Sequence, residues 1–76
     1  MIHPKFKVGD PVRVVSVPQA MIGVVGPRRP RPGEVAKVRH VVHMTDGVAY
    51  IVESLTPSGD LNWLCELYDG QIEAAS

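Results

Sequence analysis

A proline- and arginine-rich segment has the residue types that point most clearly to binding chemistry. It reads Pro27-Arg28-Arg29-Pro30-Arg31-Pro32. The prolines exclude a helix and favour an extended, polyproline-like backbone that presents the guanidinium groups outward. Such groups contact phosphates, and the segment also has the Pro-x-x-Pro spacing of polyproline ligands. Three interpretations therefore stay open: a phosphate contact, a protein contact, and an exposed loop without a partner.

Two further cations extend this basic region onto the next stretch of chain. Residues 34–43 alternate in a way that predicts a strand, with Ala36, Val38, His40 and Val42 on one face and Lys37, Arg39, Val41 and His43 on the other. The charged part of a partner-binding surface is therefore predicted to comprise Arg28, Arg29, Arg31, Lys37 and Arg39.

Histidine and cysteine are residue types that ligate metals, but their spacing here argues against a site. His40 and His43 are three residues apart in a predicted strand, so their side chains should point to opposite faces. Cys65 lies in an apolar stretch and is predicted to be a small buried residue rather than a nucleophile. We therefore predict no catalytic residue, no metal site and no cofactor.

The formal net charge of zero conceals a strong division between the two halves of the chain. Residues 1–43 hold all eight basic residues and two acidic ones, for a net charge of +6, whereas residues 44–76 hold six acidic residues and no basic one. Such asymmetry indicates a basic surface for an anionic partner, or two surfaces that neutralise one another within or between chains. A pI near 6.8 argues against a dedicated nucleic-acid binder.

Short valine-rich runs separated by Gly, Pro and Asp predict an all-β fold. A hairpin turn is expected at Thr45-Asp46-Gly47, where Asp-Gly can supply positive φ values, and a second turn at Pro57-Ser58-Gly59-Asp60. Residues 18–33 are predicted to form a long loop, and residues 66–70 a single helical turn. The five predicted strands cover residues 12–17, 34–43, 48–55, 61–65 and 71–73.

Two aromatic residues lie on the predicted strands that flank the second turn. In the third predicted strand, Tyr50 shares one face with apolar residues, and the opposite face is apolar as well. In the fourth predicted strand, Trp63 shares one face with apolar residues, and the opposite face is largely apolar. A sheet in a small monomer normally has one wet face, so part of this apolar surface should be covered by the long loop, by the C-terminal turn or by another subunit. Tyr50 and Trp63 are therefore predicted as partner-binding residues, with core packing as the alternative.

Several short motifs resemble those of bacterial SH3-like barrels. Residues 8–14, Val-Gly-Asp-Pro-Val-Arg-Val, are similar to the opening strand of that family, and residues 33–38 to the strand after its first loop. Residues 49–54 resemble its central strand, and residues 64–67 its closing segment. The resemblance covers most of the chain and implies a small five-stranded antiparallel barrel with a long Pro/Arg-rich first loop and a short helical turn near the C-terminus.

A second resemblance is to the type II dihydrofolate reductases, which are SH3-like barrels assembled as homotetramers around a shared pore. Gly9-Asp10, Val12-Arg13, residues 52–54 and the turn at residues 57–59 are similar to stretches of that family. That family lines its pore with a Val-Gln-Ile-Tyr segment, whereas this chain has Asn-Trp-Leu-Cys at residues 62–65. None of the family's substrate or cofactor contacts can therefore be assigned to a residue here.

The chain is predicted to be a single domain over residues 1–76. It has no apolar run near the roughly 18 residues of a membrane-spanning helix, and its single cysteine fits a reducing compartment, so we expect a soluble, cytoplasmic protein without membrane contact. The resemblance to bacterial SH3-like barrels implies a protein of bacterial type. We expect a non-catalytic interaction module, a homo-oligomer that binds a protein partner through an apolar and aromatic surface and a basic loop. Nucleic-acid binding through the Arg28–Arg31 loop is the first alternative, and an oligomeric enzyme of the type II dihydrofolate reductase kind is the second.

Overall fold

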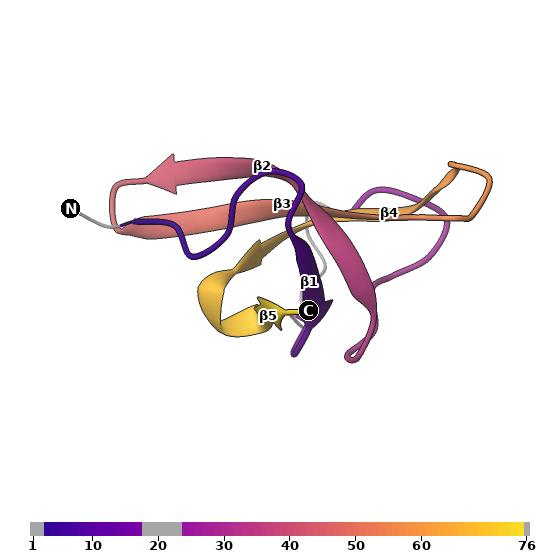
Figure 1. The fold of residues 1–76 in the computed structure, drawn as a ribbon, viewed down its shortest axis with the longest axis horizontal. Helices are drawn as coiled ribbons and strands as arrows, with labels where there is room; N and C mark the ends of the chain where they lie inside the picture. Colours follow the sequence, from indigo (N-terminus) through magenta and orange to yellow (C-terminus); the bar gives the residue numbers. More distant parts are fainter. Residues whose placement is uncertain (1–2, 18–23, 76) are drawn as a thin grey trace.

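The computed structural model describes residues 3–17 and 24–75, and it confirms the predicted all-β class (Figure 1). One antiparallel sheet has the strand order β4-β3-β2-β1-β5, so that β4 and β5 are its edge strands within the described residues. The strands are β1 (Pro11–Val14), β2 (Val35–Met44), β3 (Gly47–Leu55), β4 (Leu61–Tyr68) and β5 (Ile72–Ala74), with a 3₁₀ turn, η1 (Asp69–Gln71), between the last two.

The five strands lie close to their predicted positions, and only two boundaries differ by more than one residue. The first strand ends at Val14 rather than at residue 17, and β4 continues to Tyr68, so the helical turn starts three residues later than predicted. Part of the long loop predicted for residues 18–33, namely residues 18–23, lies outside the described residues. No helix among the described residues is long and apolar enough to cross a membrane.

The long strand β2 connects the two parts of the sheet. Its first residues pair with β1, and from Lys37 onward it pairs with β3. Figure 1 shows β2 bending between these partners, so that β1 and β5 run across the direction of β3 and β4. This bend encloses the core between the two parts of the sheet.

The bend in β2 coincides with a β-bulge, which changes which side chains face the core. The pairing of β2 with β3 shifts between Val38 and His40, leaving Arg39 as the extra residue. Val41 consequently packs against the core, while His40 and Val42 lie on the opposite face. The predicted grouping of His40 and Val42 with Val38 is therefore wrong, because one inserted residue reverses the alternation that follows it.

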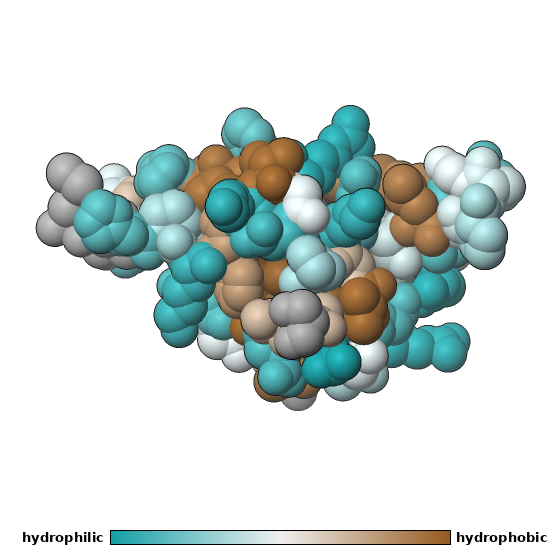
Figure 2. Space-filling view, viewed as in Figure 1, coloured by the Kyte–Doolittle hydropathy of each residue, from teal (hydrophilic) through white to brown (hydrophobic). Residues whose placement is uncertain are grey.

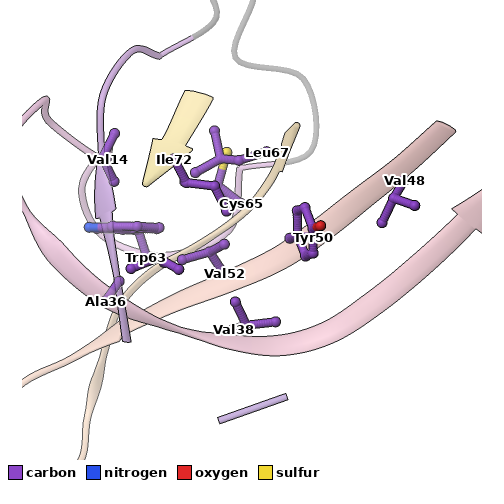
Figure 3. Close-up of a cluster of buried hydrophobic side chains, with 11 residues drawn as sticks. Val14, Ala36, Val38, Val48, Tyr50, Val52, Trp63, Cys65, Leu67 and Ile72 are labelled. Carbon is purple, nitrogen blue, oxygen red and sulfur yellow. The ribbon is translucent and has the colours of Figure 1, made fainter. Parts of the chain in front are cut away.

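The core is a single cluster of buried side chains from all five strands (Figure 3). Trp63, Tyr50 and Leu67 are its largest fully buried members. In Figure 3 the indole of Trp63 lies beside Val14 and Ala36, where β1 and β2 cross over β4. Phe6, from the segment before β1, packs edge-on against Tyr50 with ring centroids 5.4 Å apart.

The two turns predicted from glycine form by different means. Between β2 and β3 the turn consists of Thr45 and Asp46, and neither Asp46 nor Gly47 has a positive φ. The hairpin is confirmed, but its expected dependence on positive φ is wrong. In the turn between β3 and β4, Gly59 does adopt a φ of 93°, as the Pro-early, Gly-late pattern requires.

Candidate interaction surface

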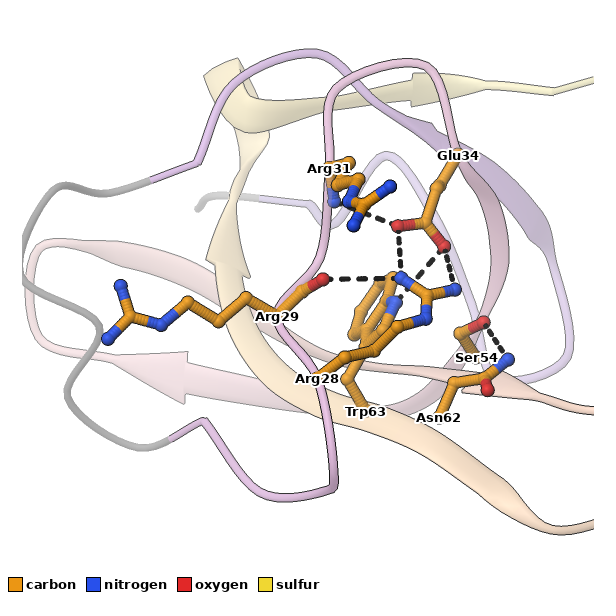
Figure 4. Close-up of polar contacts among 7 residues, drawn as sticks. All are labelled: Arg28, Arg29, Arg31, Glu34, Ser54, Asn62 and Trp63. Carbon is orange, nitrogen blue, oxygen red and sulfur yellow. Dashed lines mark hydrogen bonds and ion pairs between the residues drawn. The ribbon is translucent and has the colours of Figure 1, made fainter.

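The basic loop, residues 27–32, is held against the sheet by one carboxylate. Glu34, which directly precedes β2, accepts two hydrogen bonds of 2.7 Å from the Arg28 guanidinium (Figure 4). It also accepts the main-chain N–H of Arg31 at 2.9 Å and the indole N–H of Trp63 at 3.2 Å. A bidentate arginine pair combined with a bond to a core indole fixes the position of the loop relative to the core.

The orientation of Arg28 corrects the prediction that all three loop arginines point outward. Its guanidinium faces Glu34 and also donates to the Arg29 carbonyl at 3.2 Å, while its main-chain N–H reaches the Asn62 carbonyl at 3.4 Å. Pro30 is buried. Arg28 therefore helps to hold the loop against the sheet, because its guanidinium pairs with the carboxylate of Glu34. The sequence alone identifies Glu34 only as one of the two acidic residues in the basic half of the chain.

Arg29 and Arg31 differ from Arg28 in that their side chains are exposed. Figure 4 shows the Arg29 side chain pointing away from Glu34. Neither of these two residues forms an ion pair with another described residue. The surface that the basic loop offers to a partner consequently contains two of its three arginines.

The environment of Glu34 lowers the pKa of its carboxyl from the ordinary value of 4.5. The hydrogen bonds from Arg28 are the main cause, with further contributions from Trp63 and Arg31, while partial burial acts in the opposite direction. Because the folded-state pKa lies below the unfolded-state pKa, the ionised carboxylate stabilises the fold fully above the unfolded value. This stabilisation is lost as the pH falls through the folded pKa.

The variant Glu34→Gln should lower the free energy of unfolding at pH 7 by about 1–3 kcal/mol, since the charged acceptor of several hydrogen bonds is removed. It should also lose less stability than the wild type between pH 5 and pH 2, which urea titrations at several pH values would measure. Glu73→Gln, in an exposed side chain of β5, is the matched control and should keep the wild-type profile. Parallel profiles for Glu34→Gln and the wild type would contradict this assignment.

Tyr50 and Trp63, predicted as partner-binding residues, are both fully buried in the core. Their positions on β3 and β4 turn both side chains inward, and the Tyr50 hydroxyl accepts the main-chain N–H of Lys5 at 2.9 Å. Burial is the main cause that raises the pKa of Tyr50, and the Asp69 carboxyl raises it further. Their side chains do not reach the surface of this chain, so the core alternative holds for both.

Lys37 and Arg39 lie on β2 with exposed side chains, as predicted. Arg39 forms an ion pair with Glu53 of β3, with the closest atoms 3.4 Å apart. Lys37 lies opposite Glu53 in the register but forms no ion pair with a described residue. Together with Arg29 and Arg31, they supply the exposed cations of the candidate surface.

The histidines and the cysteine are not brought together in the described part of the chain. No group of three or more His, Cys, Asp or Glu side chains with metal-binding geometry occurs there. Cys65 is buried, and its thiol lies 3.5 Å from the Glu66 carbonyl. Burial raises the pKa of this thiol, which disfavours the nucleophilic thiolate.

The face of β2, β3 and β4 turned away from the core, here called the outer face, is the feature that sequence reasoning located least well. It contains the half-buried side chains of Val42, Ile51 and Leu64, and Tyr68, which is 44% exposed. Figure 2 shows the molecule from the side of the segment before β1, where hydrophobic residues at the surface over β2 have hydrophilic residues around them. The sequence pattern did not predict this face, because the bulge at Arg39 determines which β2 side chains lie on it.

Charged residues on the outer face are segregated by strand. Lys37 lies on β2 at one side, and Glu66 lies on β4 at the other. Between them, β3 contributes Ile51 and Glu53. The outer face therefore carries a basic residue on β2 and acidic residues on β3 and β4, with apolar side chains on all three strands.

Comparison of the chain with protein-family models, with curated proteins and with solved structures gave no match. The resemblances to SH3-like barrels and to type II dihydrofolate reductases consequently remain predictions.

Proposed function

We propose that this chain is a non-catalytic interaction module with an SH3-like barrel fold, which self-associates and binds a protein partner. The barrel assignment is supported by a long, bent β2 that pairs with both β1 and β3, and by the 3₁₀ turn that precedes β5. Of the features that the family resemblance implies, the five antiparallel strands and the turn near the C-terminus occur among the described residues.

The outer face is the single observation that carries the functional proposal. Apolar surface patches mark interaction sites in soluble proteins, and the side chains of Val42, Ile51, Leu64 and Tyr68, here called the apolar strip, lie together on this face of the sheet. A two-fold arrangement of two copies brings the basic β2 side of one against the acidic β4 side of the other. The apolar strip then supplies burial, and the segregated charges fix the orientation. The exposed Arg29 and Arg31 remain available for charge selection of a further protein partner.

A dilution series followed by ¹⁵N–¹H NMR tests which surface associates. We expect concentration-dependent shifts at Ile51, Leu64 and Tyr68, and Tyr68→Asp should abolish them by placing a charge in the apolar strip. Ala74→Asp, which places the same charge at an exposed position of β5, is the matched control and should leave the shifts unchanged. Shifts confined to the basic loop would contradict the proposal.

Salt-sensitive binding of a single-stranded oligonucleotide, lost in the Arg29→Ala/Arg31→Ala variant, would favour nucleic-acid binding instead.

A further inference from the structure

The point at which β2 leaves β3 forms an open fork in the sheet. The pairing between these strands starts at Lys37 and Glu53. Before that point, Val35 and Ala36 of β2 pair with β1, and beyond it Ser54 and Leu55 of β3 pair only with β4. At the fork, β2 is therefore paired only with β1, and β3 is paired only with β4. Figure 1 shows β2 diverging there from the hairpin of β3 and β4.

Main-chain groups on the β2 side of the fork are oriented toward the gap. The Glu34 carbonyl accepts from Val14 at 2.8 Å, and Val38 exchanges bonds of 3.0 and 2.8 Å with Asp10 and Gly9, so these even-numbered residues face β1. Since successive residues of a strand direct their N–H and C=O groups to opposite sides, those of Val35 face the fork. Among the described residues, no strand pairs with Val35 on that side.

A groove with a volume of about 270 Å³ occupies the outer side of this fork. Its walls are the side chains of Val35 and Leu55. Both are large apolar residues, and they are 54% and 48% exposed to water. Ala36 and Ser54, both small and buried, form its floor. The Ser54 hydroxyl accepts a hydrogen bond of 3.3 Å from the Asn62 side chain, which holds the floor in place.

The charge at the rim of the groove is unbalanced. Lys37 and Glu53 both line it, but Glu53 is already paired with Arg39. Lys37 therefore presents an uncompensated positive charge on the same face as Val35, two residues away along β2. A carboxylate opposite Lys37 would complement it as a cross-strand pair.

We propose that the fork binds an extended segment of a partner protein by strand addition to Val35. This inference rests on the proposed function and names the surface and the chemistry of the partner. The segment hydrogen-bonds to the main chain of Val35, places an apolar side chain between Val35 and Leu55, and directs an acidic side chain two positions away toward Lys37. The residue between them faces the floor at Ala36 and Ser54, and has to be small.

The peptide acetyl-Thr-Val-Ala-Asp-Thr-amide matches this pattern and is the probe for the test. Titrated into the ¹⁵N-labelled full chain, it should shift the amide signals of Val35, Lys37 and Leu55 and slow hydrogen exchange at Val35. N-methylation of the peptide's valine removes its main-chain donor and should weaken binding about tenfold or more.

Charge reversal supplies the specificity control. Lys37→Glu should weaken binding severalfold, and a peptide with lysine in place of aspartate should restore it. Lys5→Glu, an equivalent change at an exposed position away from the groove, should have no effect. Absence of binding at millimolar peptide, or shifts confined to residues 24–33, would overturn the inference. A protein that fails this test but still self-associates through its outer face would lose the fork proposal alone, whereas failure of both measurements would also remove the proposed function.

Discussion

In the Trp63→Ala variant we expect the free energy of unfolding to fall by about 3–5 kcal/mol. Trp63 is fully buried where β1 and β2 cross β4, so its loss leaves a large cavity. A domain of this length has a total stability of roughly 4–11 kcal/mol, so the variant should lose between about a quarter and all of the wild-type stability. Urea denaturation followed by circular dichroism measures the loss.

Trp63→Phe separates the packing contribution of the ring from that of its N–H group. The phenyl ring fills most of the cavity but cannot donate to Glu34, so its cost should be smaller than that of alanine and should shrink when Glu34→Gln is already present. If Trp63→Ala instead costs less than about 1 kcal/mol, Trp63 is not the centre of the core. That outcome would reopen its predicted role at an interface.

The Gly26→Ala variant should be the other severe substitution, with an expected loss of at least about 3 kcal/mol. Gly26 has a φ of 121°, and a Cβ there would lie 2.7 Å from the Asn62 carbonyl oxygen and 2.8 Å from the Trp63 Cα. Both atoms belong to the β4 main chain, which cannot move aside like a flexible side chain. The loop must therefore shift, and the two hydrogen bonds between Val25 and Leu64, of 2.9 and 2.7 Å, should be lost.

Gly33→Ala is the matched control for this prediction. Gly33 also has a positive φ, of 93°, but a Cβ there meets no atom within 4 Å. Its cost should be limited to the backbone strain of about 1–2 kcal/mol. Thermal or urea unfolding of the two variants side by side should show Gly26→Ala as clearly the less stable. Equal losses would show that the close approach of the loop to β4 does not contribute.

The strands and turns were predictable because they depend on local patterns. Short apolar runs bounded by Pro, Gly and Asp, rich in valine in the first three strands, marked the strands to within a few residues, and the β3–β4 turn used Gly59 as expected. The face of β2 beyond Val38 was not predictable in the same way. A bulge of one residue at Arg39 has no distinctive residue type, yet it reverses the alternation.

The candidate surface was only half predictable, because it depends on long-range contacts. The cations at Arg29, Arg31, Lys37 and Arg39 are exposed as composition indicated. Glu34 accepts hydrogen bonds from Arg28 and from Trp63, which are 6 and 29 positions away in the sequence, and alternation could not predict either contact. Aromatic residues suit cores and interfaces equally well, so burial alone assigns Tyr50 and Trp63 to the core.

The central claim is that this chain is an interaction module that covers its outer face with a second copy. The most direct measurement is its mass in solution, obtained by light scattering on the eluate of a size-exclusion column over a range of micromolar concentrations. A single chain has a mass of 8.3 kDa. We predict at least twice this mass for the wild type, and the monomer mass for Tyr68→Asp. A wild-type protein that remains at 8.3 kDa at every concentration would contradict the claim.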